Sequence, residues 1–325
     1  MKHLFIINPD AAKIKGRAGE IKEEIESFFL KNSQFEYDIH ITRWKRDATG
    51  FVRRYVSETD EPVRVHCYGG AGTLFEVVNG AANLPNAEVA AYPMGTSNEF
   101  LLYFGKGNGH LFRSIRNQVT SGTTPVDAIR CGSIHGISHA LVGMEARSNR
   151  DGVEMLERTN LPADFCYVWP AAWEILTGRI KAQSYKIDVD GMPFDGNYMS
   201  INIANGPCYG ENMYVAGDAH PNDGLLEVSL MNDMSVLKLL TTIHPYTTGQ
   251  YKKIPDRIRR VSGKKIKISS DEVMCVCLDG ETFYENSIEY EVAPHAIHFV
   301  CPKDIDITRR PRIYNHPEEG FVGDQ

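Results

Sequence analysis

The first hundred residues alternate between short apolar runs and segments in which apolar residues recur at helical spacing. The runs typical of strands are LFII (4–7), FEYDIHI (35–41), VRVHCY (63–68) and EVAAYP (88–93). The segments with helical spacing are GEIKEEIESFFL (19–30), DATGFVRRYVSE (47–58), for which Asp47 is the expected N-cap, and TLFEVVNGAAN (73–83). Alternation at this interval predicts a parallel sheet with helices on both faces. We therefore expect an α/β doubly wound domain over residues 1–125.

The second half of the chain has a different pattern. Short β-rich segments separated by Gly, Asn, Asp or Pro turns occur at 184–191, 197–205, 225–231, 264–270, 272–280 and 287–294. Two helical segments are expected near 165–178 and 235–244. This pattern predicts a mostly antiparallel β-sandwich domain over 126–302, followed by a polar tail at 303–325. A chain of 325 residues has room for two domains of ordinary size.

The composition of the chain argues against several classes of protein. The formal net charge of −7 argues against general nucleic-acid binding through a basic surface. The seven cysteines include no C-x-x-C pair, which favours buried thiols in a reducing compartment over disulfides or a metal site. The N-terminus has no cleavage-site pattern, and the apolar stretch 166–176 is too short to span a bilayer. We expect a cytoplasmic protein.

Two glycine-containing turns follow neighbouring predicted strands. They are Tyr68-Gly69-Gly70-Ala71-Gly72-Thr73 and Pro93-Met94-Gly95-Thr96-Ser97-Asn98. Ligands of open parallel sheets bind beyond the carboxyl ends of the strands, where glycine lets the backbone approach an anion and free amides at a helix start favour negative charge. The alternative is that these turns only reverse the chain and their hydroxyls cap helices. Neither turn is a Walker A loop, because no G-K-[ST] is present.

The Asp279-Gly280-Glu281 segment follows a predicted strand. Phosphoryl transfer needs a carboxylate that accepts the proton of the attacking hydroxyl, and two carboxylates two residues apart share a face of an extended chain. The alternative is a simple hairpin turn, since Asp-Gly is common there.

Five motifs together carry a family resemblance. They are I-I-N-P (6–9), V-H-C-Y-G-G-A-G-T-L-F-E-V-V-N-G (65–80), Y-P-M-G-T-S-N-E-F (92–100), A-G-D-A-H-P-N-D-G-L-L-E-V (216–228) and C-L-D-G-E (277–281). In this order they resemble the catalytic-domain family of diacylglycerol kinases and sphingosine kinases. The resemblance implies an ATP-binding α/β domain followed by a β-sandwich, with the active site in the cleft between them.

The resemblance also implies roles for individual residues. It implies an ATP- and Mg²⁺-dependent lipid kinase, a transferase of phospholipid metabolism, with Asp279 as general base and Glu281 as its partner or a metal-side ligand. Asp127 and Asp223 would belong to a structural Mg²⁺ network, and Asp127 could instead be a solvated loop charge. The implied nucleotide contacts are Asn8, Gly69, Gly70, Gly72, Thr73, Glu76, Gly95, Thr96 and Asn98.

The acceptor would be a diacylglycerol-like lipid, while a peripheral membrane contact and a homo-oligomer stay open. The segment DFCYVWPAAWEILTGRIK (164–181) is either a core helix or an element that lines an acyl pocket or touches a membrane surface. The charged run 252–260 is either a solvated loop or a site of attraction to anionic lipid.

One position departs from the family pattern. Ala71 stands where the family's G-G-D-G-T loop has an aspartate that orders Mg-ATP, and alanine cannot do this. The protein could catalyse with Asp279 and Glu281 alone, it could be a pseudokinase that binds nucleotide or lipid without turnover, or Ala71 could be a deliberate inactivating substitution. NAD kinase-like activity is a further alternative because that branch shares the G-G-D-G-T loop, although the segments 92–100 and 277–281 are closer to the lipid branch.

Overall fold

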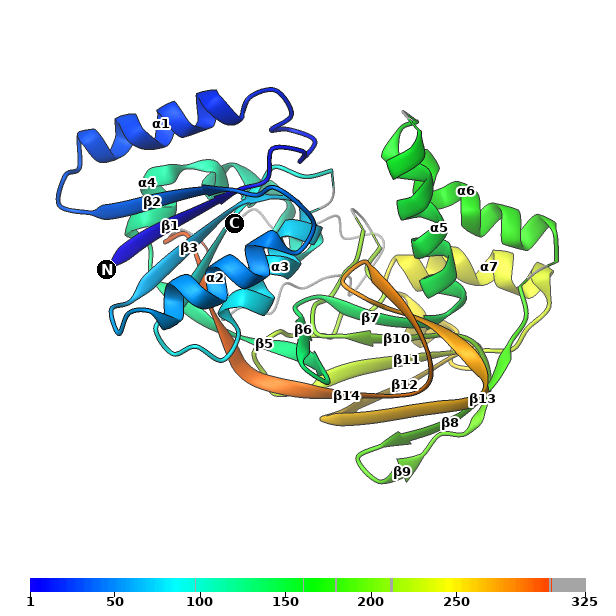
Figure 1. Cartoon of the computed structure of the whole chain (residues 1–325). Coiled ribbons are helices and arrows are strands. Elements are labelled where there is room, and N and C mark those ends of the chain that lie inside the picture. Colours follow the sequence, from blue (N-terminus) through cyan, green and yellow to red (C-terminus); the bar gives the residue numbers. More distant parts are fainter. Residues whose placement is uncertain (97, 160, 179, 211–212, 304, 306–325) are drawn as a thin grey trace. The chain divides into compact units, whose positions relative to one another are not determined.

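The computed structural model describes residues 1–325 except 97, 160, 179, 211–212, 304 and 306–325 (Figure 1). The chain forms two compact units. Unit 1 contains Met1–Ala128 and the segment that begins at Pro294, and unit 2 contains Ile129–Ala293. The first boundary is close to the expected one at 125/126. The end of the last strand belongs to unit 1, whereas we expected it in the second domain. Most of the expected tail 303–325 lies outside the described residues.

Unit 1 is built on a parallel sheet. Its elements are β1 (Lys2–Ile7), α1 (Ala18–Leu30), β2 (Glu36–Ile41), α2 (Asp47–Ser57), β3 (Val63–Gly69), α3 (Ala71–Ala81), β4 (Ala87–Pro93), the 3₁₀ helices η1 (Glu99–Phe104) and η2 (Lys106–Arg113), and α4 (Ile115–Thr120). The strand order is β4-β3-β1-β2, and the end of β14 (Glu281–Val300) pairs with β4 in parallel. Each predicted strand and helix of this half is therefore present.

Helices cover both faces of this sheet. On one face, α1 packs its buried side chains Ile21, Ile25 and Phe29 with Phe5 and Ile7 of β1 (Figure 1). On the other face, α2 and α3 pack against each other, and α3 contacts β3 and β4. The two helices approach closely because Gly80 has no side chain: a Cβ there would lie 2.6 Å from Cβ of Val52. The doubly wound α/β fold is confirmed.

The predicted N-cap of α2 is wrong. The N-cap is Arg46, which has a left-handed backbone with φ 71°, and Asp47 is the first helical residue. The Asp47 carboxylate instead accepts the N–H of Arg43, at 3.0 Å. The first amides of α2 are bound by Glu76, whose carboxylate oxygens accept the N–H groups of Arg46 at 2.8 Å and Ala48 at 3.1 Å. A carboxylate from the neighbouring helix α3 thus replaces the local cap.

Unit 2 is mostly antiparallel. Its elements are the end of β5 (Thr123–Cys131), β6 (Ile134–Gly136), β7 (His139–Gly143), α5 (Met144–Arg158), α6 (Ala163–Leu176), β8 (Gln183–Val189), β9 (Met192–Pro193), β10 (Gly196–Ala204), β11 (Leu226–Asn232), α7 (Val236–Thr247), the 3₁₀ helix η3 (Tyr251–Lys253), β12 (Ile258–Gly263), β13 (Lys265–Leu278) and the first part of β14. The strand path β12-β11-β10-β7-β13-β14 is antiparallel at each step. The predicted antiparallel second domain is confirmed, with the segments 264–270 and 272–280 joined in one strand, β13.

Helix α5 was not predicted. Its sequence MEARSNRDGVEMLER is polar, and its buried residues are only Ala146 and Gly152. The helix forms against α6, where Gly152 allows close contact: a Cβ there would lie 2.8 Å from Cδ1 of Tyr167. Tertiary packing outweighs the weak local signal here. Within the described part of the chain, no helix combines the length and apolar character needed to cross a bilayer.

Candidate nucleotide and acceptor sites

The carboxyl ends of β1, β3 and β4 meet at one edge of the unit 1 sheet. Ile7 pairs with Tyr68, and Gly69 pairs with Pro93. From β1 the chain passes through α1 to β2 on one side, and then returns through α2 to β3 on the other side. The direction of winding therefore reverses between β1 and β3, which is where open α/β sheets bind ligands. We call the loops that follow these strands the phosphate edge.

Asn8 connects two loops of the phosphate edge. Its backbone N–H donates to the carbonyl of Tyr68 at 3.0 Å, and its Nδ2 donates to Oγ1 of Thr73 at 2.9 Å. Its Oδ1 accepts the N–H of Asp10 at 3.0 Å. The side chain therefore holds the end of β1 against the first turn of α3.

In the first glycine turn, the space available for a side chain differs from one glycine to the next. A Cβ on Gly69 would lie 2.3 Å from Cβ of Thr73, so only glycine fits beside the buried threonine. Gly70 is the N-cap of α3 with an extended backbone and makes no side-chain cap. Gly72 is exposed, and a Cβ there would meet nothing within 4 Å. The first amides of α3 thus face an open surface, where the partial positive charge of a helix start favours an anion.

The second glycine turn lies against the first. The N–H of Met94 donates to the carbonyl of Gly69 at 3.0 Å. Asn98 uses its Nδ2 to close the turn, donating to the carbonyl of Gly95 at 3.1 Å, whereas Thr96 is exposed. Ser97 lies outside the described residues. Both predicted turns therefore belong to one edge of one sheet.

Glu76 has a structural partner at this edge, because its carboxylate binds the start of α2. The predicted nucleotide contact of Glu76 stays a prediction.

The loop after β2 belongs to the phosphate edge and was missed in the sequence. The N–H of Thr42 donates to the carbonyl of Ile7 at 2.9 Å, which places the loop beside the end of β1. The four residues that follow are all exposed and carry three cations: Arg43, Trp44, Lys45 and Arg46. Cations near open helix amides suit a polyphosphate. The run R-W-K-R directly after a predicted strand was the available signal.

Asp279 lies in a tight hairpin between β13 and β14. Leu278 pairs with Glu281, and both Asp279 (φ 46°) and Gly280 (φ 91°) have positive φ, as in a type I′ turn. The hairpin alternative thus describes this segment correctly. The buried Asp279 carboxylate accepts three further backbone bonds, from the N–H groups of Ile137 (2.5 Å), Ser138 (3.0 Å) and His139 (2.9 Å). Asp279 therefore fixes the segment that leads into β7, and Glu281 is half-buried two residues on.

The two aspartates expected in a Mg²⁺ network lie in different units. Asp127, in unit 1, is fully buried and its Oδ1 accepts the N–H of His295 at 2.8 Å. Asp223, in unit 2, is exposed and its Oδ1 accepts the N–H of Leu225 at 3.1 Å. In the described residues, no three His, Cys, Asp or Glu side chains gather closely enough to hold a metal ion. The Mg²⁺ roles of Asp127 and Asp223 therefore stay predictions, and Mg²⁺ that arrives with phosphates needs only one or two carboxylates.

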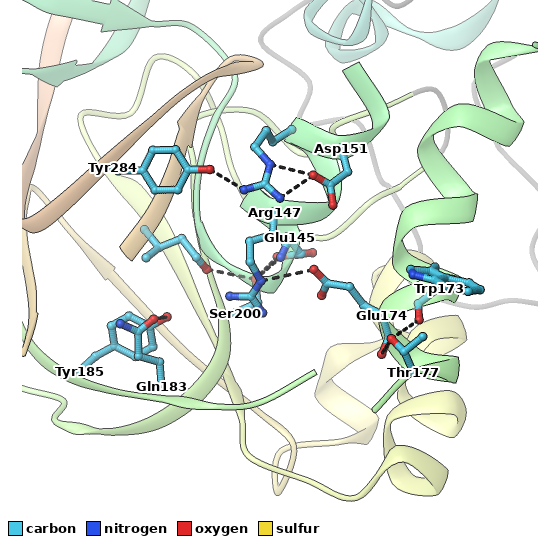
Figure 2. A network of polar contacts seen from close by, with 12 residues as sticks. Glu145, Arg147, Asp151, Trp173, Glu174, Thr177, Gln183, Tyr185, Ser200 and Tyr284 are labelled. Atoms are coloured by element: carbon cyan, nitrogen blue, oxygen red, sulfur yellow. Dashed lines mark hydrogen bonds and ion pairs between the residues drawn. The ribbon is translucent and has the colours of Figure 1, made fainter. Parts of the chain in front are cut away.

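Unit 2 contains a polar network that the sequence did not reveal (Figure 2). The Glu145 carboxylate accepts the hydroxyl of Ser200 at 2.7 Å, that of Tyr209 at 2.6 Å and that of Tyr246 at 3.4 Å. Burial raises the pKa of Glu145, and these hydroxyls oppose the shift. The three donors come from distant parts of the sequence, so no local motif announces the network.

Two arginines of α5 extend this network. Nε of Arg147 lies 3.3 Å from Oε1 of Glu174 in α6 (Figure 2). Arg150 binds Asp151 and the hydroxyl of Tyr284. Burial raises the pKa of Glu174, and Arg147 opposes the shift. The two carboxyl groups thus have raised pKa values for the same reason, burial, and each is partly compensated by polar partners within unit 2.

Comparisons with known proteins agree with this architecture. Residues 2–131 match the family model "Diacylglycerol kinase catalytic domain", and residues 138–301, half of the chain, match "YegS C-terminal NAD kinase beta sandwich-like domain". A "Putative lipid kinase" of Staphylococcus aureus strain bovine RF122 / ET3-1 is 25% identical over 241 residues, which cover 73% of this chain and 76% of the relative.

Solved structures share the fold. A diacylglycerol kinase structure from Bacillus anthracis strain Sterne is 19% identical, with a TM-score of 0.68 over 94% of this chain and 98% of that chain. A second structure from the same strain, described as "A putative diacylglycerol kinase", is 20% identical with a TM-score of 0.68, and the match covers 93% of this chain and 97% of that chain.

Proposed function

Because the chain belongs to the diacylglycerol kinase-like family of lipid kinases, we propose that it transfers the γ-phosphate of ATP to a lipid hydroxyl. The observation that carries the proposal is the phosphate edge. There Asn8, both glycine turns and the cationic loop after β2 meet at the point where the sheet reverses its winding.

The nucleotide phosphates would bind at the start of α3. The exposed, unobstructed Gly72 leaves room for them, and the first amides of α3 supply hydrogen-bond donors. The exposed Arg43 and Lys45 would neutralise phosphate charge. Mg²⁺ bound to the phosphates would supply further charge neutralisation.

The acceptor hydroxyl needs a proton acceptor, a role that we assign to Asp279 with Glu281 as its partner. Three backbone amides fix the Asp279 carboxylate in one orientation, so its remaining lone pair would be presented to an acceptor hydroxyl in a defined direction. The acceptor class is a neutral lipid hydroxyl such as that of diacylglycerol, so the reaction would take place at a membrane surface.

Ala71 is the residue that limits this function. It is the first residue of α3, and its methyl group cannot order a metal-nucleotide complex. We expect slow transfer by the natural protein and an increase of at least about tenfold in the Ala71→Asp variant, because a carboxylate there would help to organise charge around the phosphates.

The test is transfer of radiolabelled phosphate from ATP to diacylglycerol, ceramide or sphingoid bases in detergent micelles, by the natural protein and by Ala71→Asp. Labelled lipid phosphate is the expected product. If neither protein labels any of these acceptors, the proposal is wrong. NAD⁺ belongs in the same assay, because formation of NADP⁺ would assign the chain to the other kinase branch.

A pseudokinase is the second candidate, and two observations favour it. Ala71 removes the usual carboxylate, and the three amide bonds of Asp279 also suit a purely structural residue. Calorimetry separates the two functions: ATP binding without turnover, unchanged in Ala71→Asp, would identify a nucleotide-binding regulator.

A further inference from the structure

Helix α6 presents an apolar stripe to solvent. Its members recur at intervals of three, four and one residues, so they lie on one face of the helix. They are Phe165, Val168, Trp169, Trp173 and Leu176, which are exposed, and the half-buried Ala172. Val168 is 66% exposed and Leu176 is 74% exposed. Phe165 stacks on Trp169 with ring centroids 5.5 Å apart, and Trp169 stacks on Trp173 at 6.1 Å.

The opposite face of α6 is the one that packs inside unit 2. Cys166, Pro170 and Glu174 are buried there. Figure 2 shows the contrast between neighbours in sequence: Glu174 is directed toward Arg147 of α5, whereas Trp173 is directed away from it. The helix is therefore amphipathic, but its aromatic face is exposed to solvent instead of packing inside unit 2.

Helix α7 has the same character. Leu239 and Tyr246 are buried, while the exposed apolar residues are Val236, Leu237, Leu240 and Ile243. The two helices are neighbours within unit 2, because Ile175 of α6 packs against the core cluster that contains Leu239 and Tyr246 (Figure 1). Exposed apolar surface on two adjacent helices is unusual for a soluble chain and marks an interaction site.

We propose that the α6 stripe, together with the exposed face of α7, docks the protein on the surface of a lipid bilayer. The proposal rests on the proposed function in one respect, since a lipid acceptor lies in a bilayer. Tryptophan and phenylalanine favour the interface between water and lipid. Helix α6 has 14 residues, a length of about 21 Å, so it would lie in the interface plane.

Charge also favours a bilayer. Lys253 of η3, which follows α7, and Lys181, just after α6, are exposed, and so is Lys252, whose Nζ lies 3.6 Å from the Asp218 carboxylate. Exposed cations that follow two helices with exposed apolar residues complement anionic lipid headgroups. A second copy of the chain docked through the same face would instead bring equivalent lysines together, because a two-fold interface uses the same patch on both subunits.

The test measures binding of the full chain to vesicles without nucleotide, so it does not depend on kinase activity. We expect the chain to float with phosphatidylcholine vesicles that contain phosphatidylglycerol, and to float less with phosphatidylcholine alone. The double variant Val168→Ser/Leu176→Ser should bind at least about tenfold more weakly, because each lost side chain contributes apolar burial in the interface. Leu30→Ser is the matched control: Leu30 of α1 in unit 1 is 84% exposed, and its loss should leave binding unchanged.

Tryptophan fluorescence provides a second measurement. The chain has three tryptophans, and Trp44→Phe leaves only Trp169 and Trp173 of α6. Their emission should shift to the blue on addition of vesicles. Three results would each overturn the proposal: no binding to either vesicle, equal binding by the double variant and the natural protein, or a dimer in sedimentation velocity that the double variant abolishes. Labelled product in micelles together with no vesicle binding would reject the docking surface alone and leave the kinase function intact.

Discussion

The phosphate edge of unit 1 and the polar network of unit 2 are built in different ways. The phosphate edge uses backbone amides, glycines and short side chains, held by contacts such as the one between Asn8 and Thr73. The polar network uses long side chains that bond to one another inside the unit, with Glu145 as the shared acceptor. The first arrangement should depend on steric fit and the second on buried charge and hydrogen bonding.

The largest effect is expected at the centre of the polar network. Glu145→Ala would leave the hydroxyls of Ser200, Tyr209 and Tyr246 without their common acceptor and would also create a void. We expect a loss of about 4 kcal/mol in the free energy of unfolding, measured by urea denaturation.

Glu154→Ala is the control on the same helix, since the ion pair of Glu154 with Arg158 is exposed. It should change the free energy of unfolding by less than about 1 kcal/mol. Equal losses in the two variants would mean that the buried network contributes no more than a surface ion pair, and the distinction between the two regions would then fail.

The pH dependence of the free energy of unfolding also compares the two units, because each contains a buried histidine. Burial lowers the pKa of His3 in unit 1 to about 4, with smaller effects from Arg64 and the terminal amine. Burial also lowers the pKa of His139 in unit 2 to about 4. Each folded histidine stays neutral while the unfolded chain takes up a proton near 6.5. The contribution of each neutral histidine to the free energy of unfolding is therefore fully present above pH 6.5. It falls by about 3 kcal/mol for each histidine as the pH drops from 6.5 toward about 4.

The measurement is urea unfolding across this pH range for His3→Gln, His139→Gln and the control His110→Gln, in which the replaced histidine is exposed. The first two variants should lose part of the acid sensitivity, and the control should keep all of it. Unit 1 should be the more acid-sensitive of the two, because His3 is bonded to His66, whose pKa burial also lowers. Acid curves that coincide for all three variants would contradict this account.

These contrasts explain how much the sequence could predict. The parallel sheet and the glycine turns were predicted because strand periodicity and turn composition are local signals. The Glu145 network was not, because its donors lie 55, 64 and 101 residues from the carboxylate that they bind. Helix α5 was missed for a related reason: its buried face consists of Ala146 and Gly152, too little for a hydrophobic pattern. Local rules even misled at Asp47, because Glu76 of another helix caps α2.

A smaller effect is expected from steric change at the phosphate edge. Gly69→Ala would place a methyl group 2.3 Å from Cβ of Thr73, so β3 or α3 must shift, and we expect a loss of about 2 kcal/mol in the free energy of unfolding. Gly72→Ala adds the same methyl group three residues away, where nothing lies within 4 Å, and should not destabilise the protein. Thermal unfolding of both variants measures the two losses of stability. Similar losses in the two variants would show that the stability of the phosphate edge does not depend on the steric fit between Gly69 and Thr73.

The smallest effect concerns the bond between the side chains of Asn8 and Thr73, which joins two loops of the phosphate edge. Asn8→Ala removes the donor to Thr73, and Thr73→Val removes the acceptor while keeping the shape of the side chain. A double-mutant cycle in urea unfolding should give a coupling energy of about 1 kcal/mol, the usual net value of one hydrogen bond. Repeating the cycle with ATP sharpens the comparison with unit 2. If phosphates bind at this edge, ATP should change the measured coupling between Asn8 and Thr73, whereas a change of equal size in the coupling between Ser200 and Glu145 would place the nucleotide effect outside the phosphate edge.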